Sequence, residues 1–402
     1  FIRKKIENNH EKQVFIYISH EHLDHFDADF LNSLENRNFN IICPKFKRTF
    51  LEDWVNQYQC NKRYILLDQE EIIIDEFFKF TLFVEDCELN RDSGILIKID
   101  NYVIYDGNDC KYDNLDLLTK YGNVDILCQQ FSGASWHPMC YDYLIKDYNE
   151  ITKKKRESKK KSILRFINKL NTKMYIPCAG PPVFLDPLLI EKTKQNFSIF
   201  PRANWIKDIL KEEEPHVNCP IFMPGDTFNI DTFEFIELNK HRVDDYNFED
   251  FLKYVNTYQN DYIHVFEERL LENNKINDEE VLIKLKNAIQ EKLDMIKHLK
   301  FTEIYPTYIK LFNYDQFIRI DFNEKEIKMV DKIEETYKVY MLETYGWQIN
   351  KVLNGIITWD DFHLTLRSKL YRKPDKFQTL LNAFIFQQKE DLTRCFEYVI
   401  NV

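Results

Sequence analysis

The sequence predicts an α/β fold, and three features of the chain support that prediction. Over residues 14–67, apolar runs rich in β-branched and aromatic side chains alternate with segments of helical periodicity. Over residues 71–105, strand-like runs follow one another directly, as in a sheet that is antiparallel in part. Over residues 278–299, apolar residues recur at helical spacing, which predicts a long amphipathic helix in the later part of the chain.

The elements of the first half follow from these patterns in chain order. Residues 14–18 are a continuous apolar run, which predicts a buried strand. Asp27 is a good N-cap, so a helix is expected over residues 28–34. Pro44 closes a short strand at 40–43. The remaining expected elements are a helix at 48–58 and strands at 64–67, 71–74, 77–84, 94–99, 102–105 and 124–128.

The composition changes after residue 231, which divides the chain into three expected domains. These are an α/β domain at 1–231, which carries the candidate metal ligands described below, a helical connector at 232–300 and a small α+β domain at 301–402. The last of them resembles the sterol-carrier-like α+β fold, a small sheet with a helical cover. The expected elements are helices at 248–256, 262–271, 278–299, 348–353 and 359–368 and strands at 308–312, 317–322 and 327–330.

The composition indicates a folded protein with reduced thiols. The chain has 402 residues, of which 44% are apolar and 15% aromatic, and only 8 Gly, so little disorder is expected. The net charge of −11 argues against a general nucleic-acid or anionic-membrane binder, because neutralising phosphates needs the opposite sign. Nine single cysteines without a Cys-x-x-Cys pair, together with the lack of a long apolar run or a leader, lead us to expect a cytoplasmic protein.

The loop expected after the first strand is the most informative stretch of the chain. It places four potential metal ligands, His20, His22, Asp24 and His25, within six residues. Alternate residues of an extended segment share one side, so His20 and His22 can face the same way. Because borderline divalent ions prefer neutral imidazoles and carboxylates, we expect one or two metal ions, Fe or Zn, at this loop. The alternative is a set of surface histidines beside a helix start.

This pattern, His-x-His-x-Asp-His, resembles the signature of the metallo-β-lactamase superfamily. The resemblance implies an αββα sandwich, in which two β-sheets lie between helices and one or two zinc or iron ions bind at one edge. It also implies that Asp24 can hold a water molecule or take its proton. Members usually have several strands before this loop, whereas here it follows Phe1 after only 19 residues, so the sandwich is expected to be N-terminally incomplete.

A second ligand is expected on the polar loop that follows the strand at 102–105. The resemblance implies an Asp at about this place that can bridge two metal ions. Asp109 is our choice for that role, and Asp106 is the fallback. The alternative is an ordinary turn in which Asp and Gly serve the shape of the backbone.

Three segments carry a closer resemblance, which covers about residues 20–231. They look like the corresponding stretches of the metallo-β-lactamase-like domain of CMP-N-acetylneuraminate hydroxylase and its bacterial Rieske-linked relatives. The segments are residues 108–110, 129–139 and 176–182. This resemblance implies iron-dependent oxygen chemistry with electrons delivered by a Rieske centre.

The chain departs from that family pattern in three ways. Residues 85–92 contain no histidine, although one commonly precedes the second ligand loop. Asp186 stands where a late histidine would follow the Ala-Gly turn, so Asp186 is expected as a ligand. The chain has no Cys-x-His pair, so it cannot build a Rieske iron–sulfur centre, and the electron donor would lie on missing sequence or on another chain. A carboxylate-rich ligand set favours iron or manganese over zinc.

Two further features each have a structural and a functional explanation. Residues 153–165 are rich in Lys and precede an apolar stripe; we favour a solvated helix face over a basic helix that attracts a nucleotide or another anion. Trp136 and His137 lie on the loop after the strand at 124–128. They are candidate substrate-binding residues, and the alternative is that both are packed inside the fold.

Three hypotheses about function follow. The first is an iron-dependent oxidoreductase or hydroxylase acting on a sugar or nucleotide-linked substrate. The second is a metal-dependent hydrolase of a phosphoester, amide or ester, in which a metal lowers the pKa of a bound water. The third is a degenerate, non-catalytic binding module, favoured if Asp109 and Asp186 do not converge on the histidine loop. The expected partners are a small-molecule substrate and a Rieske-type electron donor, with no nucleic acid and no membrane.

Overall fold

The computed structural model describes most of the chain in two compact units. The described residues are 2–8, 11–35, 37–85, 92–133, 135–239, 242–299, 304–334, 337–387, 389, 392–393 and 395–396. The first unit comprises Phe1–Gly133, Lys154–Pro181 and Phe200–Asn247, and the second comprises Ala134–Lys153, Pro182–Ile199 and Phe248–Val402. The domain boundaries expected at residues 231 and 300 stay a prediction.

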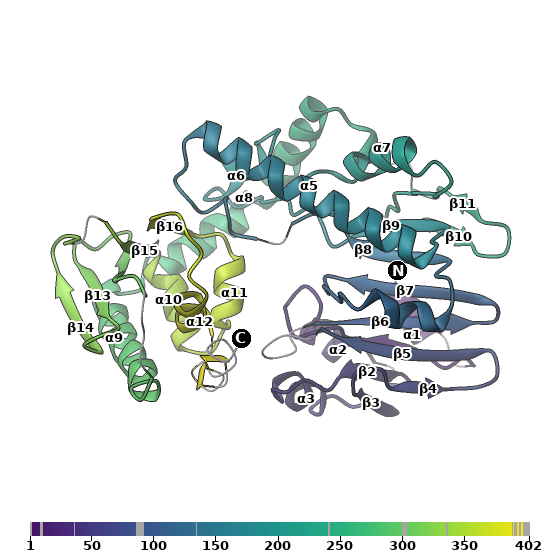
Figure 1. Ribbon diagram of the computed structural model, residues 1–402, viewed down its shortest axis with the longest axis horizontal. Helices are drawn as coiled ribbons and strands as arrows, with labels where there is room; N and C mark the ends of the chain where they lie inside the picture. Colours follow the sequence, from purple (N-terminus) through teal and green to yellow (C-terminus); the bar gives the residue numbers. More distant parts are fainter. Residues whose placement is uncertain are drawn as a thin grey trace. The chain divides into compact units, whose positions relative to one another are not determined.

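Two main β-sheets build the first unit (Figure 1). The smaller is parallel, in the order β1 (Phe15–Tyr17), β2 (Asn40–Pro44), β3 (Lys62–Leu66). The larger is antiparallel from its first strand to β7 and parallel from β7 onward, so the meander predicted at 71–105 is confirmed. Its strands, in spatial order, are β4 (Glu71–Ile73), β5 (Phe78–Val84), β6 (Ser93–Ile99), β7 (Tyr102–Asn108), β8 (Ile126–Gln130) and β9 (Met174–Cys178).

The alternation of side chains along the strands separates three apolar clusters in this unit. In β2, Ile41 packs with the helices outside the smaller sheet, whereas Ile42 faces the larger sheet. In β5, Leu82 joins the same middle cluster as Ile42, whereas Phe83 packs on the far side with helices. Because neighbouring strand residues point to opposite faces, the clusters stack as helix, sheet, sheet and helix. The αββα sandwich that the resemblance implied is therefore confirmed by the packing.

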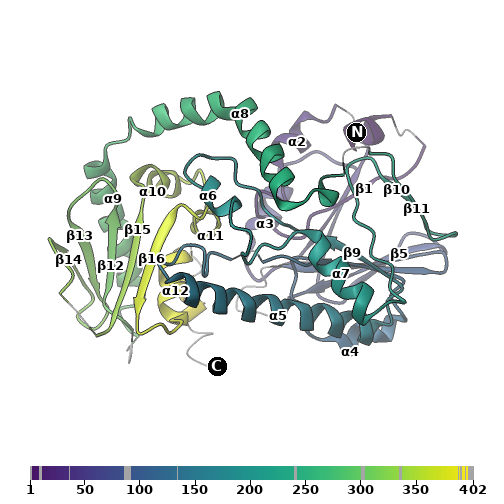
Figure 2. The same ribbon diagram turned by 90° about the horizontal axis from the view of Figure 1, so that it is seen from above.

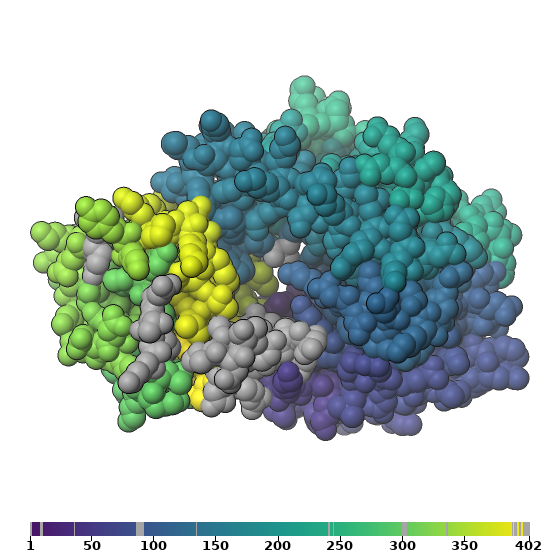
Figure 3. Space-filling model, in the orientation of Figure 1, coloured from purple at the N-terminus to yellow at the C-terminus, as the bar shows by residue number. Residues whose placement is uncertain are grey.

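Helices form the two outer layers of the first unit. The N-cap expected at Asp27 is confirmed, since its Oδ1 accepts a hydrogen bond from the backbone N–H of Phe30 at 2.8 Å. Apolar residues of α5 and α7 pack against one face of the larger sheet. The steel-blue and teal atoms of this part of the chain lie at the surface of the molecule (Figure 3). The helices are α1 (Ile2–Glu7), α2 (Ala28–Ser33) and α3 (Phe50–Val55) on the smaller sheet, and α4 (Leu115–Leu118), η1 (Thr119–Tyr121), α5 (Ile145–Leu170) and α7 (Ala203–Glu213) on the larger. The part of α5 that belongs to the first unit begins at Lys154.

The basic segment at 153–165 lies within α5. Its apolar stripe, Ile163, Phe166, Ile167 and Leu170, is buried against the larger sheet, with exposed fractions of 2% or less. The structural explanation of this segment is therefore confirmed. The last elements of the first unit are a hairpin of β10 (Thr227–Asn229) and β11 (Glu234–Ile236) and the short helix η2 (Val243–Asp245).

The second unit is a small α+β arrangement, as predicted (Figure 2). Its sheet has the order β14-β13-β12-β15-β16, in which only the pairing of β12 with β15 is parallel. The helix α9 packs against α10 and β14. The elements are α6 (Ile190–Thr193), α8 (Phe248–Asn273), α9 (Asp278–Met295), β12 (Thr307–Leu311), β13 (Phe317–Asp321), β14 (Glu326–Val330), β15 (Val339–Thr344), α10 (Gly346–Leu353), α11 (Trp359–Leu364), β16 (Ser368–Lys373) and α12 (Thr379–Phe386). Its likeness to the sterol-carrier-like fold stays a prediction.

Two predictions for this unit were wrong. The helices expected at 248–256 and 262–271 are one continuous helix, α8, because the polar residues between them include no Pro or Gly to break it. The helix expected at 359–368 ends at Leu364, and Ser368 already begins β16, which pairs with β15. None of the helices that the structure describes combines the length and the apolar character needed to cross a membrane.

Candidate metal centre

The histidine loop meets the larger sheet at the carboxyl-terminal end of β7. The loop follows β1, and Asn108 and Asp109 follow the end of β7. Because β6 runs antiparallel to β7, the start of β6 lies at the same edge, where Ser93 Oγ donates to the backbone oxygen of Ser19 at 2.9 Å. Asn108 Nδ2 lies 3.1 Å from His25 Nδ1. These contacts join the edges of the two sheets into one site.

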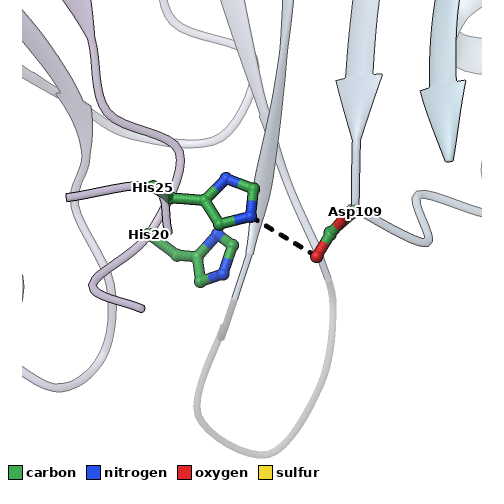
Figure 4. Close-up of side chains that lie close together, drawn as sticks. All are labelled: His20, His25 and Asp109. Atoms are coloured by element: carbon green, nitrogen blue, oxygen red, sulfur yellow. Dashed lines mark ion pairs between the residues drawn. The ribbon is translucent and has the colours of Figure 1, made fainter. Parts of the chain in front are cut away.

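The core of this site is formed by His20, His25 and Asp109 (Figure 4). One ligand atom from each of the three residues lies within 4.8 Å of the others. His25 Nε2 lies 3.5 Å from Asp109 Oδ2. Bonds of about 2.0–2.2 Å to one ion place neighbouring ligand atoms roughly 3–3.5 Å apart, so small side-chain movements bring all three onto one ion. The residues therefore fit a divalent metal.

His20 is held in place by two polar neighbours. Its side chain is only 2% exposed, and Nδ1 lies 3.1 Å from Asp92 Oδ1 and 3.0 Å from Ser19 Oγ. A carboxylate that accepts the Nδ1 proton selects the tautomer whose Nε2 lone pair is free for a metal. The Asp92 carboxylate thus has the place of a partner that orients a metal-binding histidine.

The other two predicted ligands of the loop lie next to this core. His22 Nδ1 is 2.7 Å from His20 Nε2, so the two nitrogens can face one ion or share a hydrogen bond. Asp24 is different, because its side chain is 79% exposed and its Oδ2 lies 3.6 Å from His25 Nε2. An exposed carboxylate at this distance is free to turn toward a ligand or toward solvent.

The charges around the candidate centre raise the pKa of His25 and lower the pKa of Asp109. Burial lowers the pKa of His25, but the hydrogen bond and charge of Asp109 and the charge of Asp24 outweigh it, so the pKa is raised. Burial raises the pKa of Asp109, yet its contact with His25 and the nearby histidines bring the pKa below its usual value. The pKa of Asp106 is raised to about 6, chiefly by burial and also by the nearby charges of Asp92 and Asp109.

The fallback residue Asp106 has a structural contact, since its Oδ1 accepts the backbone N–H of Asn108 at 3.1 Å. The chosen residue Asp109 is held from the opposite side by a chain of two hydrogen bonds. Gln130 Nε2 donates to Asp109 Oδ1 at 3.1 Å, and Lys159 Nζ donates to Gln130 Oε1 at 2.9 Å. This leaves Asp109 Oδ2 directed at the histidines.

Sequence reasoning missed four residues that support the centre: Ser19, Asp92, Gln130 and Lys159. Ser19 and Gln130 carry a weak signal, because each lies where a predicted strand ends. Asp92 and Lys159 carry none, because their contacts depend on pairing between distant segments.

Asp186, predicted as a ligand, belongs to the second unit and has an arginine partner there. Its Oδ2 accepts from Arg367 Nη2 at 2.5 Å and from Nε at 3.2 Å, and its Oδ1 accepts from the backbone of Leu188 at 2.9 Å. The group of described residues that could hold a metal does not include it. Its metal role stays a prediction.

Trp136 and His137, predicted as substrate contacts, also lie in the second unit. The Trp136 ring packs on the imidazole of His363, with centroids 3.2 Å apart. His137 Nε2 lies 2.9 Å from Tyr143 Oη, which in turn donates to the Asp375 carboxylate at 3.0 Å. Both residues therefore have packing or hydrogen-bonding partners within the unit, and their substrate role stays a prediction.

The sequence is similar to mycobacterial proteins that are described as Rieske 2Fe-2S iron-sulfur proteins. It is 27% identical over 183 residues to one from Mycolicibacterium smegmatis and 26% identical over 183 residues to one from Mycobacterium tuberculosis. Each match covers 44% of this chain and 35% of the relative, so the matched segment spans about a third of the relatives' length. No protein-family model matches the chain.

The solved structures to which the chain is similar include metallo-β-lactamase fold proteins. The diiron β-hydroxylase CmlA from Streptomyces venezuelae matches with a TM-score of 0.36 and 12% identity, over 52% of this chain and 44% of that chain. The metallo-β-lactamase fold protein YhfI from Bacillus subtilis matches with a TM-score of 0.32 and 9% identity, over 52% of this chain and 75% of that chain. The layer order of the first unit is established by its three apolar clusters and does not depend on these structural matches.

Proposed function

We propose that the first unit is a metal-dependent enzyme domain of the metallo-β-lactamase type. His20, His25 and Asp109 hold the ion, and His22 and Asp24 are further ligands. The observation that carries this proposal is the convergence of two imidazoles and a carboxylate, from loops more than 80 residues apart, within 4.8 Å. Such a nitrogen and oxygen donor set suits iron, manganese or zinc.

We infer further that the reaction is an oxidation by an iron-dependent enzyme similar to CMP-N-acetylneuraminate hydroxylase. The substrate would be a sugar or nucleotide-linked small molecule, and a Rieske-type protein or segment would supply electrons. Two observations support this inference: the carboxylate within the ligand core and the similarity to proteins described as Rieske 2Fe-2S iron-sulfur proteins. An iron ion with open positions supplies dioxygen activation when electrons arrive.

In this proposal the residues of the chain have separate tasks. Asp92 and Ser19 fix the ring of His20 through Nδ1, and Gln130 fixes Asp109 through Oδ1. Holding ligand side chains by a second layer of hydrogen bonds raises metal affinity and keeps the ligand geometry constant through a reaction. The exposed carboxylate of Asp24 is the group best placed to accept or donate a proton at the open side of the site.

That same carboxylate favours a second candidate, a metal-dependent hydrolase. In a hydrolase, Asp24 takes the proton of the attacking water, a role that needs a mobile carboxylate close to the ligands. The third hypothesis, a degenerate, non-catalytic binding module, is favoured if Asp109 and Asp186 do not converge on the histidine loop. Asp109 lies 3.5 Å from His25, whereas Asp186 pairs with Arg367.

The test is elemental analysis of protein produced in medium supplemented with iron and zinc. We expect at least one equivalent of transition metal in the wild type and a loss of most of it in His20→Ala and Asp109→Ala. His216→Ala is the matched control, because the His216 side chain is 63% exposed and its Nδ1 lies 3.7 Å from Glu214 Oε2, away from the candidate ligands in the sequence. Iron supports the oxidoreductase, and zinc with ester or phosphoester turnover supports the hydrolase. Folded wild-type protein without metal contradicts both.

A further inference from the structure

A cavity of about 980 Å³ lies along the strand edge that also carries the metal centre. Its walls come from the loops after β2 (residues 45–47), β3 (67–69) and β7 (111–114) and from the end of β5 (84–85). The loop after β7 is the one that also carries Asp109, two residues before Lys111. Pockets for small organic molecules measure roughly 300–1,000 Å³, so the cavity has the size and the place of a substrate pocket.

The cavity wall carries three carboxylates, Asp68, Glu85 and Asp113, and two of them, Asp68 and Asp113, are engaged by neighbouring groups. Asp68 Oδ1 accepts the backbone N–H of Val84 at 2.9 Å, and Oδ2 accepts from Gln69 Nε2 at 2.8 Å. Asp113 pairs with Arg165 Nη2 at 2.5 Å. These hydrogen bonds and this ion pair already satisfy much of the negative charge, so the two carboxylates are poor partners for the cations of the wall.

The wall also carries three lysines, Lys45, Lys47 and Lys111. In the part of the chain that the structure describes, Lys45 and Lys111 form no ion pair. Both side chains are exposed, and both residues line the cavity. Lys159 adds a further cation near Lys111, since burial and the charge of Lys111 lower the pKa of Lys159 to about 8.

We propose that this cavity binds the anionic group of a small organic molecule, a phosphate or a carboxylate, through Lys45 and Lys111. An anion between these lysines gains charge-assisted hydrogen bonds and relieves the repulsion among the cations. The proposal rests on the proposed function for the statement that this molecule is the substrate of the metal centre. The binding of the anion itself needs no metal, and this allows the two proposals to be tested separately.

The experiment is isothermal titration calorimetry of the full chain at low ionic strength, with glucose 6-phosphate, citrate and glucose as probes. We expect at least one of the two anions to bind and glucose not to bind. The anion that binds more tightly identifies phosphate or carboxylate as the preferred group. Lys45→Ala and Lys111→Ala should each weaken binding by about tenfold, and Lys111→Arg by much less. Lys120→Ala, at an exposed lysine outside the cavity wall, is the matched control and should bind like the wild type.

Two results would overturn the proposal. One is a folded wild type that binds neither anion. The other is a Lys45→Ala/Lys111→Ala double variant that keeps the wild-type Tm and circular dichroism and still binds with wild-type affinity. Titrating chelator-treated protein in parallel separates this proposal from the proposed function, because a metal-free chain that still binds the anion supports the cavity even if no metal is ever retained. Added salt should weaken the binding, as expected for partly exposed cations.

Discussion

Asp92→Asn tests whether the carboxylate behind His20 supports a metal site. Asp92 is 7% exposed, and its Oδ1 lies 3.1 Å from His20 Nδ1 and accepts the backbone N–H of Ser93 at 2.7 Å. Asparagine has nearly the same shape, so the packing is kept. The change removes the negative charge, and with it the preference for the His20 tautomer that leaves Nε2 free for a metal.

The size of the effect follows from the type of hydrogen bond. A hydrogen bond to a charged group contributes about 1.5–3 kcal/mol, and the burial of both partners keeps water from replacing it. Each 1.4 kcal/mol is a factor of ten, so metal affinity should fall by roughly 10- to 100-fold. The free energy of unfolding of the metal-free protein should change much less, because Asn can still accept the N–H of Ser93.

The assay is competition for the metal with a chromophoric chelator, with the wild type, Asp92→Asn and Asp27→Asn side by side. Asp27→Asn is the matched control, because Asp27 caps α2 and Asn is an equally good N-cap. Equal metal affinity in all three proteins would refute the reasoning, since it would mean that the contact between Asp92 and His20 has no influence on metal binding.

Three further variants test the packing and charges of the first unit. Arg48→Met removes the ion-pair partner of the buried Glu21, between two of the predicted ligands, and should lower the free energy of unfolding in urea by about 3–5 kcal/mol. Gly94→Ala places a Cβ 2.5 Å from Tyr105 Oη, so the buried ring must shift and the same measurement should fall by about 1–3 kcal/mol. Burial would raise the pKa of Asp226, but backbone N–H groups and an arginine lower it. A carboxyl group whose pKa is lowered by folding stabilises the fold at pH values above its unfolded pKa of about 4. This contribution is lost as the pH falls further. Because Asn does not titrate, Asp226→Asn should show a weaker acid destabilisation below about pH 4 than the wild type.

Each of these predictions has a comparison that can contradict it. Lys146→Met changes an exposed residue in the first turn of α5 and should leave stability unchanged; an equal loss in this variant would contradict the argument for Arg48. Gly107→Ala places its Cβ 3.1 Å from the ring of Tyr105, so its loss should be smaller than that of Gly94→Ala. Identical acid transitions of the wild type and Asp226→Asn would contradict the pKa argument.

Local patterns predicted most elements of the first unit, because they depend on a few neighbouring residues. The run at 14–18 contains β1, and Asp27 caps α2 as expected. The pattern was less informative where polar residues interrupt an element. Helix α8 passes through such a stretch, because Thr, Asn and Asp inside a helix cost less than about 0.7 kcal/mol each and are carried by the turns on either side.

The candidate ligand loop could be predicted from the sequence because its residues are contiguous. The choice of Asp109 over Asp106 came from the resemblance. The group of described residues that could hold a metal contains Asp109. Asp186 is predicted by the same resemblance, and its role as a ligand stays a prediction. Its position relative to a family motif suggested a ligand, yet the structure gives its carboxylate two hydrogen bonds from Arg367, which lies 181 residues away in the sequence.

The sequence by itself determined the type of fold, the strand that positions the histidines, and the chemical character of the candidate ligands. Only the tertiary structure decided which distant groups meet them: Asp92 on His20, and Gln130 with Lys159 on Asp109. The physical reason is that side-chain periodicity and capping act within a few residues. The pairing of β6, β7 and β8 and the stacking of two sheets depend on the whole chain, and these arrangements bring the supporting groups to one edge.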